Sequence, residues 1–235
     1  MTNTLTTGPT PDPEGLRQWR FTAPPGATVI TLVRHGESAP AMSATPFPMK
    51  DGQGDPELHP EGIIQARRLG VRLAAEHREI PIDAIYVTTL RRTHQTAAPL
   101  AEAIGVDPIE LADLREVHLG DWEGGIFRQK ERDGDPIWTE VFAGERWDVI
   151  PGAESSEAFT ARIRAGIDRI AAAHPDQRVV SVSHGGVIGH ILHLAAQSRP
   201  FAFAGVGNAS ISEIVVHDGR WILRRFNDTT HLSTP

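Results

Sequence analysis

The sequence contains no cysteine, a single tyrosine and three methionines among its 235 residues. The absence of cysteine excludes disulfides, thiolate catalysis and cysteine-ligated zinc, so a nucleophile would come from serine, threonine, histidine, aspartate, glutamate or lysine. No apolar stretch approaches the length of a membrane span, and the N-terminus has neither the basic start nor the apolar core of a signal peptide. We therefore expect no membrane association and a cytoplasmic location.

An excess of positive charge is missing as well. Lysine and arginine number 23 against 30 aspartates and glutamates, which gives a formal net charge of −7. General binding to nucleic acid needs a broad basic surface, so we expect no nucleic-acid partner. A small anionic molecule stays compatible with this charge if arginines gather in one local pocket.

From residue 28 onward the chain alternates short β-branched runs with longer helical ones. Strands are predicted at residues 28–33, 84–88 and 179–183, and a hairpin at 211–217 and 221–226 around Asp218-Gly219. Helices are predicted at 60–76, 93–104, 156–173 and 186–196. This order favours an α/β fold of three layers, α/β/α, with a mostly parallel central sheet and a C-terminal antiparallel edge hairpin.

The predicted organisation is an arm followed by one domain. Residues 1–27 are rich in threonine, proline and glycine and have few apolar anchors, among them Trp19 and Phe21, so we expect an irregular N-terminal arm. Residues 28–235 are long enough to bury one sizeable core, which favours a single domain. The sequence is compatible with a homodimer.

Two long segments show no regular pattern: Ser38–Leu58 and Val117–Gly152. The second contains three tryptophans, Trp122, Trp138 and Trp147, which favour ordered packing. Irregular segments of this length in a compact domain are usually functional, so we expect both to form walls of a pocket.

Charged and imidazole side chains follow three of the predicted strands. Arg34 and His35 follow the first strand, Arg91 and Arg92 come shortly after the second, and His184 follows the third. Because parallel sheets bind ligands beyond the carboxyl ends of their strands, these groups are expected to meet on one rim. Two histidines and two or more arginines on one rim predict an anion site, with His35 as a nucleophile that can attack phosphorus without prior deprotonation.

Release of an alcohol from phosphorus needs a proton donor, because an alkoxide leaves poorly. The segment 114–124 offers Glu116, Asp121 and Glu123. Glu116 follows the short apolar stretch that should approach the rim, which makes it the candidate acid.

Four segments then add up to a family pattern. In chain order they are 32–37 (LVRHGE), 89–97 (TLRRTHQTA), 114–116 (LRE) with 120–124 (GDWEG), and 182–186 (VSHGG). Together they resemble the motifs of the histidine phosphatase superfamily, also called the phosphoglycerate mutase-like family. The resemblance extends from about Val29 to Leu232, so it implies that residues 28–235 form the catalytic domain.

The resemblance implies a mechanism. His35 would form a phosphohistidine, while Arg34, Arg92 and His184 hold the phosphoryl oxygens and offset their charge. By its place in the motif Arg92, not Arg91, matches the family's arginine. Glu116 would protonate the leaving alcohol and then deprotonate water, and the catalytic set is His35, Glu116 and His184.

No metal and no other cofactor is expected, because the arginines supply the positive charge. Additional pocket candidates are Ser38, Gly185 and Asn208, the last from a segment that resembles one near the family's pocket. Family members usually carry an asparagine where Ala41 stands, and the chain lacks the long basic insertion of true mutases.

These features favour a metal-independent phosphomonoesterase whose partner is a small phosphorylated metabolite. The first alternative is a cofactor-dependent phosphoglycerate mutase, which would use the same residues. A non-catalytic phosphate-binding regulatory module would require a broken set of motif residues, and all of them are present. A metallohydrolase would require histidine pairs at i and i+4 or clustered carboxylates, and none of the 11 histidines shows such a zinc pattern.

Overall fold

The structure is a computed structural model that describes residue 18, residues 21–42 and residues 45–233. Most of the predicted N-terminal arm, including Trp19, lies outside these residues. Of its end, Phe21 is described, and the guanidinium carbon of Arg224 lies 3.7 Å from the centre of its ring. The division into an arm and one domain stays a prediction.

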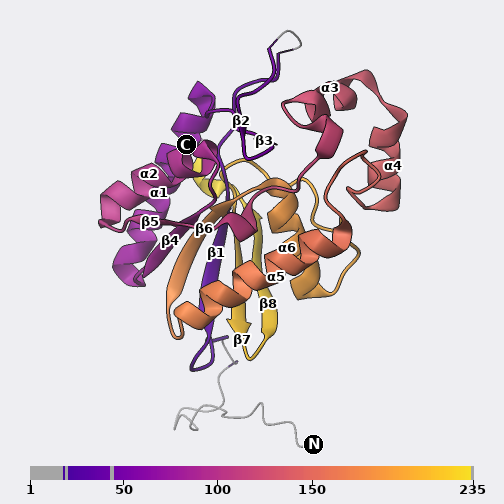
Figure 1. Ribbon diagram of the computed structural model, residues 1–235. Coiled ribbons are helices and arrows are strands. Elements are labelled where there is room, and N and C mark those ends of the chain that lie inside the picture. The colour runs from indigo at the N-terminus through magenta and orange to yellow at the C-terminus, as the bar shows by residue number, and fades with distance from the viewer. Residues whose placement is uncertain (1–17, 19–20, 43–44, 234–235) are drawn as a thin grey trace, which may run out of the picture.

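A six-stranded sheet with the order β5-β4-β6-β1-β7-β8 lies at the centre of the molecule (Figure 1). Its strands are β1 (Thr28–Arg34), β4 (Ala84–Val87), β5 (Pro108–Glu110), β6 (Arg178–Ser183), β7 (Ile211–His217) and β8 (Arg220–Asp228). The first four run parallel to one another, while β7 pairs antiparallel with both β1 and β8. The predicted fold class, with its antiparallel hairpin at one edge, is confirmed.

Helices cover both faces of the sheet, because successive side chains of the central strands point to opposite faces and are apolar on both. Ile30 and Leu32 of β1 belong to the core under α5 (Ser156–Ala173) and α6 (Gly185–Ala196). Val33 belongs to the core under α1 (Pro60–Glu79) and α2 (Arg91–Ile104). The result is the three-layer arrangement, with β1 buried in its middle.

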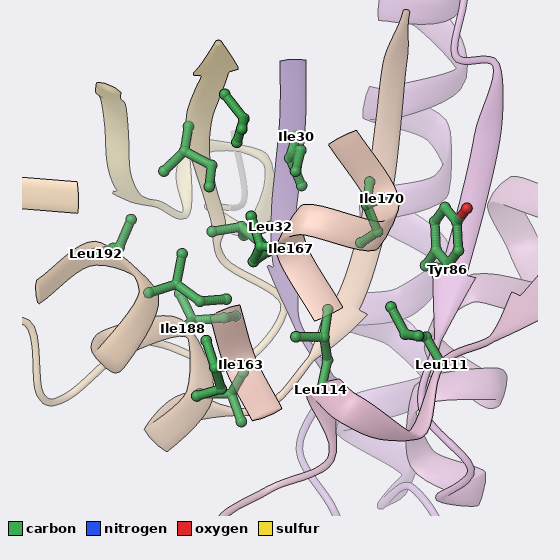
Figure 2. Packing of buried hydrophobic residues seen from close by; sticks show 14 of the residues in the cluster. Ile30, Leu32, Tyr86, Leu111, Leu114, Ile163, Ile167, Ile170, Ile188 and Leu192 are labelled. Carbon is green, nitrogen blue, oxygen red and sulfur yellow. The ribbon is translucent and has the colours of Figure 1, made fainter. Parts of the chain in front are cut away.

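The core beneath α5 shows why this helix forms where it does. Phe159, Ile163, Ile167 and Ile170 share one face of α5 and are almost fully buried. Figure 2 shows the three isoleucines near Ile30 and Leu32 of β1 and Ile188 of α6. The Ser155 hydroxyl accepts a hydrogen bond from the backbone N–H of Ala158 (3.1 Å) and thereby caps the first turn.

The prediction of an irregular segment over Val117–Gly152 was wrong. This segment contains a 3₁₀ turn, η2 (Gly120–Trp122), and two helices, α3 (Ile126–Asp133) and α4 (Pro136–Gly144). Glycines in the left-handed conformation bracket α3 at Gly125 and Gly134. We call η2, α3 and α4 the cap; in Figure 1 it lies above the carboxyl ends of the parallel strands.

Aromatic rings hold the cap together. Six rings contact one another in a chain with centroid separations of 4.6–6.2 Å: Trp122, Phe127, Trp138, Phe142, Trp147 and Phe201. The last of these rings comes from the loop after α6, so the cluster ties the cap to the main body.

The other long segment, Ser38–Leu58, contains a two-stranded ribbon, β2 (Met49–Lys50) and β3 (Gln53–Gly54). Buried Asp55 accepts hydrogen bonds from the backbone N–H (2.8 Å) and the Nε (3.1 Å) of Arg91, which fixes this segment to the start of α2. Within the described residues, no helix is long and apolar enough to cross a membrane.

Candidate active site

The parallel pairing of β1 with β6 places the two predicted histidines next to each other. Arg34 lies opposite Ser183 in the register, so His35 and His184 both follow directly on the paired strands. The backbone N–H of His35 donates to the carbonyl oxygen of Ser183 (3.0 Å), and the two imidazole centroids are 5.2 Å apart. The two side chains therefore meet at the carboxyl edge of the sheet.

The ring of His35 has one nitrogen free to act as a nucleophile. Its Nδ1 lies 2.7 Å from the carbonyl oxygen of Gly36, and because a carbonyl only accepts, Nδ1 carries the hydrogen. Nε2 then keeps its lone pair. Burial, with a further contribution from the charges of Arg92 and Arg34, holds the pKa of His35 well below its usual 6.5, so the imidazole is neutral at physiological pH.

His184 is fully buried behind His35. Its Nε2 lies 3.0 Å from the hydroxyl oxygen of Thr88, which follows the neighbouring strand β4. Its Nδ1 has no hydrogen-bond partner within the described part of the chain. Burial and the charge of Arg92 also hold the pKa of His184 well below 6.5. When the Thr88 hydroxyl donates to Nε2, Nδ1 keeps a hydrogen that an anion can accept.

Two arginines converge on the same point. Arg92 is 7% exposed and donates from Nη1 to the carbonyl oxygen of Gly54 (2.9 Å), and Arg34 donates from Nη1 to that of Val206 (2.5 Å). The buried Nε of Arg34 has no partner among the described residues. Burial lowers the pKa of both, that of Arg92 to about 10, so both remain cations at neutral pH. Buried cations with unused donors form a site suited to a phosphoryl group.

Glu116 follows the 3₁₀ turn η1 (Ala112–Leu114) and reaches the start of α6. Its Oε1 accepts from the backbone N–H of Val117 (3.0 Å), and its Oε2 accepts from that of Gly186 (3.1 Å). A Cβ at position 186 would lie only 2.6 Å from Glu116 Oε1, so the glycine is what lets the carboxyl approach. The charge of Glu116 raises the pKa values of Arg34 and Arg92 against the effect of burial.

The other two acidic residues considered for the proton donor, Asp121 and Glu123, lie in different surroundings. Asp121 is exposed. Glu123 also lines the cavity, where its carboxylate accepts the backbone N–H groups of Leu119 and Gly54, both at 2.9 Å. Glu123 thus ties the two walls of the cavity together.

A cavity of about 310 Å³ lies in front of these side chains. His35, Arg34, Arg92 and Glu116 all line it. Both long segments supply walls, as predicted, but Trp138 packs within the cap and Trp147 reaches the cavity. The aromatic part of the wall consists of Phe47, Trp122, Phe127 and Trp147.

The additional pocket candidates lie around this centre. Ser38 lines the cavity, and Gly186 lines it where Gly185 was expected; Gly185 lies against the side chain of Arg34 instead. Asn208 donates from Nδ2 to the carbonyl oxygen of His35 (3.1 Å) and lines an adjoining hollow of about 470 Å³, which Arg34 and Ser38 share.

One cation in the cavity was absent from the sequence-based prediction. Arg128 of α3 donates to the hydroxyl oxygen of Ser38 (2.7 Å) and the carbonyl oxygen of Ala39 (2.8 Å), and its guanidinium carbon lies 5.3 Å from the ring centre of Phe47. Its charge contributes to the lowered pKa of His35. No motif marks this arginine, and it reaches the cavity only because α3 forms.

Within the described residues, no group of three or more histidine, aspartate and glutamate side chains is arranged to hold a metal ion. The functional groups that meet at this site are imidazole, guanidinium and carboxyl groups.

Comparison with known proteins agrees with this geometry. A family model described as "Histidine phosphatase superfamily (branch 1)" matches residues 30–229. A metal-independent phosphoserine phosphatase of Arabidopsis thaliana is 30% identical, over 88% of this chain and 84% of its own length. Phosphoglycerate mutase-like protein 4 of the same plant is 32% identical, over 86% of each chain. The solved structure of a mycobacterial glucosyl-3-phosphoglycerate phosphatase matches with a TM-score of 0.70 and 29% identity, over 86% of this chain and 100% of that one.

Proposed function

The chain belongs to branch 1 of the histidine phosphatase superfamily and is a histidine-type phosphatase, and we propose that it hydrolyses phosphomonoesters through a phosphohistidine on His35. The observation that carries this route is the state of His35: a neutral ring whose Nδ1–H is fixed to Gly36 and whose Nε2 is free beside Arg34 and Arg92. Such a nitrogen attacks phosphorus without needing a base.

In the first half of the proposed reaction, Nε2 of His35 forms a bond to phosphorus and the bond from phosphorus to the ester oxygen breaks. Arg34 and Arg92 stabilise the phosphoryl oxygens from the cavity wall, and Nδ1–H of His184, which lies behind His35 and does not line the cavity, is the third donor once the phosphoryl group is bound. Glu116 enters the reaction protonated and gives its proton to the leaving oxygen. In the second half, Glu116 takes a proton from water, the water oxygen attacks phosphorus, and the N–P bond breaks. Inorganic phosphate leaves, and both side chains return to their starting states.

We infer the substrate class from the position of Arg128. Arg34 and Arg92 are assigned to the phosphoryl group, whereas Arg128 is a third cation on the cavity wall, which also carries the carboxyl groups of Glu116, Glu123 and Glu131. Phosphoserine and glucosyl-3-phosphoglycerate, named for two relatives, each carry a carboxylate close to the phosphoester. We therefore propose a small phosphorylated metabolite with a carboxylate that faces Arg128 and a carbon skeleton that lies on the aromatic wall.

The test is phosphate release from a panel of phosphorylated metabolites, with His35→Ala as the inactive reference. Wild type should release phosphate from carboxylate-bearing monoesters and form an acid-labile phosphoryl label that His35→Ala lacks. The variant should melt within a few degrees of wild type, because His35 lies at a polar rim. Isomerisation of 3-phosphoglycerate that depends on bisphosphoglycerate, without phosphate release, would identify a mutase instead. Absence of label with every donor would refute the covalent route.

A further inference from the structure

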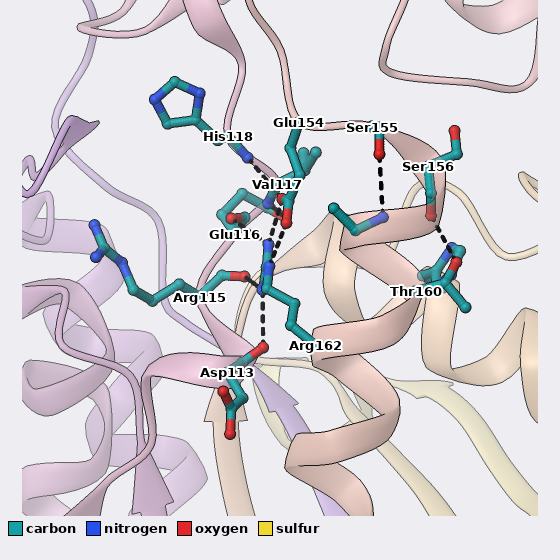
Figure 3. A network of polar contacts seen from close by, with 12 residues as sticks. Asp113, Arg115, Glu116, Val117, His118, Glu154, Ser155, Ser156, Thr160 and Arg162 are labelled. Carbon is teal, nitrogen blue, oxygen red and sulfur yellow. Dashed lines mark hydrogen bonds and ion pairs between the residues drawn. The ribbon is translucent and has the colours of Figure 1, made fainter.

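Arg162 lies in α5, does not line the cavity, and uses all five of its N–H groups (Figure 3). Two of them form a bidentate ion pair with Glu154, at 2.7 Å from Nε and 2.8 Å from Nη2. The other three donate to three carbonyl oxygens of the backbone segment 113–116, those of Asp113 (2.8 Å), Arg115 (2.7 Å) and Glu116 (2.9 Å).

That segment carries the proposed acid, and beyond η1 it has no regular structure. Residues 115–118 belong to neither a helix nor a strand, and the carbonyl oxygens of Arg115 and Glu116 accept from no backbone N–H among the described residues. Besides Arg162, only Gln53 among the described side chains donates to the carbonyl oxygen of Glu116, from Nε2 at 2.7 Å. The backbone position of Glu116 therefore depends on side chains that come from distant parts of the sequence.

Glu154 fixes the far end of the same segment. Its backbone N–H donates to the carbonyl oxygen of His118 (2.9 Å), and its Oε2 accepts from the N–H of His118 (3.4 Å). The carboxylate also neutralises Arg162, whose guanidinium carbon lies 4.9 Å from the ring centre of Phe159. The pair thus holds the segment on both sides of Glu116 without adding net charge near the cavity.

The close packing of α5 against η1 fixes the distance between Arg162 and the backbone of the Glu116 segment. One turn further along the helix, Gly166 lies so close to η1 that a Cβ there would meet Cβ of Asp113 at 2.9 Å. Helix and segment are therefore in direct contact, which leaves the guanidinium little freedom. At its other end, Glu116 is held through the N–H of Gly186 at the start of α6.

We propose that Arg162, oriented by Glu154, is a positioning residue that keeps the Glu116 carboxyl within reach of the leaving oxygen. Arg162 does not line the cavity; its charge contributes to the lowered pKa of His184, and its hydrogen bonds act on the reaction through Glu116. This inference rests on the role proposed for Glu116 as the acid. A carboxyl displaced from its place transfers a proton less well, and general acid catalysis contributes about 10²–10⁴-fold to rate.

The experiment compares an alkyl phosphate, which needs a protonated leaving group, with p-nitrophenyl phosphate, which hardly does. Arg162→Met should lower kcat for the alkyl phosphate about tenfold or more and kcat for p-nitrophenyl phosphate less than about threefold. Arg162→Lys, which keeps the charge and three donors, should lie between wild type and Arg162→Met. Adding Arg162→Met to Glu116→Gln should not slow the alkyl phosphate further, because the acid is already lost.

Arg178→Met is the matched control, since Arg178 is a buried, ion-paired arginine at the opposite end of β6. It should lower the melting temperature without changing the ratio of the two substrates. Equal slowing of both substrates by Arg162→Met would leave Arg162 a purely structural role and overturn the inference. If Glu116→Gln slows the alkyl phosphate more than p-nitrophenyl phosphate and Arg162→Met does not, the positioning role of Arg162 is wrong, while Glu116 remains the proposed acid. If Glu116→Gln itself does not discriminate, the proposed acid is wrong.

Discussion

His35 and His184 stay uncharged beside two guanidinium groups, although an imidazole in water would often carry a proton near neutral pH. Burial is the larger cause for both, and the positive field of Arg92 adds to it. In the proposed mechanism, the positive charge that attracts a phosphoryl group therefore also repels the proton that would block the nucleophile. Anion binding and activation of the nucleophile would then have the same electrostatic cause.

This coupling predicts the effect of Arg92→Gln on the pH profile. Removal of the positive charge should raise the pKa of His35, so the acidic limb of kcat/KM for p-nitrophenyl phosphate should move to higher pH, besides a loss in rate. The profile is measured from pH 4 to pH 8. Arg169→Gln, which alters an exposed arginine of α5, should leave the limb in place. An unchanged limb in Arg92→Gln would show that Arg92 does not act on the protonation of His35.

Arg128→Gln tests the second half of the substrate. The variant should raise KM for carboxylate-bearing monoesters about tenfold, which corresponds to about 1.4 kcal/mol, and should change KM for p-nitrophenyl phosphate less than about twofold. Arg132→Gln on the same helix is the control, because its side chain points to the adjoining hollow and is largely exposed. Equal effects of Arg128→Gln on both substrates would contradict recognition of a carboxylate.

Among the helices and strands, the sequence predicted those with a clear apolar periodicity or a β-branched run and missed those without one. The buried strands β1, β4 and β6 and the helices α1, α2, α5 and α6 all appear, with α1 three residues longer and α2 beginning at Arg91. β5 has only three residues and offers no periodic signal. α3 is polar along most of its length, so its helical character comes from the glycines at its ends and from rings outside it.

The same contrast holds for the candidate site. The meeting of His35, Arg92 and His184 at one edge of the sheet could be predicted because each follows a parallel strand, while their roles stay a prediction. Arg128 could not, since it depends on an unpredicted helix. Arg162 could not either, because its role consists of hydrogen bonds to backbone atoms, which leave no trace in residue type at a given spacing.

The cap should behave as a unit of its own. Phe127 contacts three aromatic rings of the cap cluster and lines the cavity, so Phe127→Ala should loosen α3 and raise KM several-fold. Amide exchange over residues 120–150 should accelerate while the central strands stay protected. Phe226→Ala, on the edge strand β8, should change neither KM nor exchange in the cap. Unchanged exchange in the cap of Phe127→Ala would show that the other rings suffice.

For the whole molecule, the buried histidines make stability depend on pH. The pKa values of His35 and His184 are lowered by burial, and that of His190 is lowered to about 4 for the same main reason. Below pH 6.5 the unfolded chain binds protons at these positions and the folded chain does not, so the free energy of unfolding decreases as the pH is lowered. Each fully buried histidine contributes a decrease of up to about 1.4 kcal/mol for each pH unit.

Thermal unfolding between pH 7.5 and pH 5 tests this expectation. The melting temperature should drop by several degrees, and the slope should be shallower in His35→Ala, which removes one of the titrating groups. Identical slopes in wild type and His35→Ala would mean that His35 takes up its proton equally well in both states.

The place of β1 in the sheet has a further consequence during synthesis on the ribosome. β1 is the first strand of the sheet to be made, yet its two neighbours, β6 and β7, begin only at Arg178 and Ile211. The apolar strand that leads into His35 therefore stays unpaired until β6 and β7 have emerged. Strand pairs between such distant segments form slowly, and the unpaired edge is a site where chaperones bind. The edge of the sheet that carries His35 and His184 therefore forms only after β6 and β7 have been made.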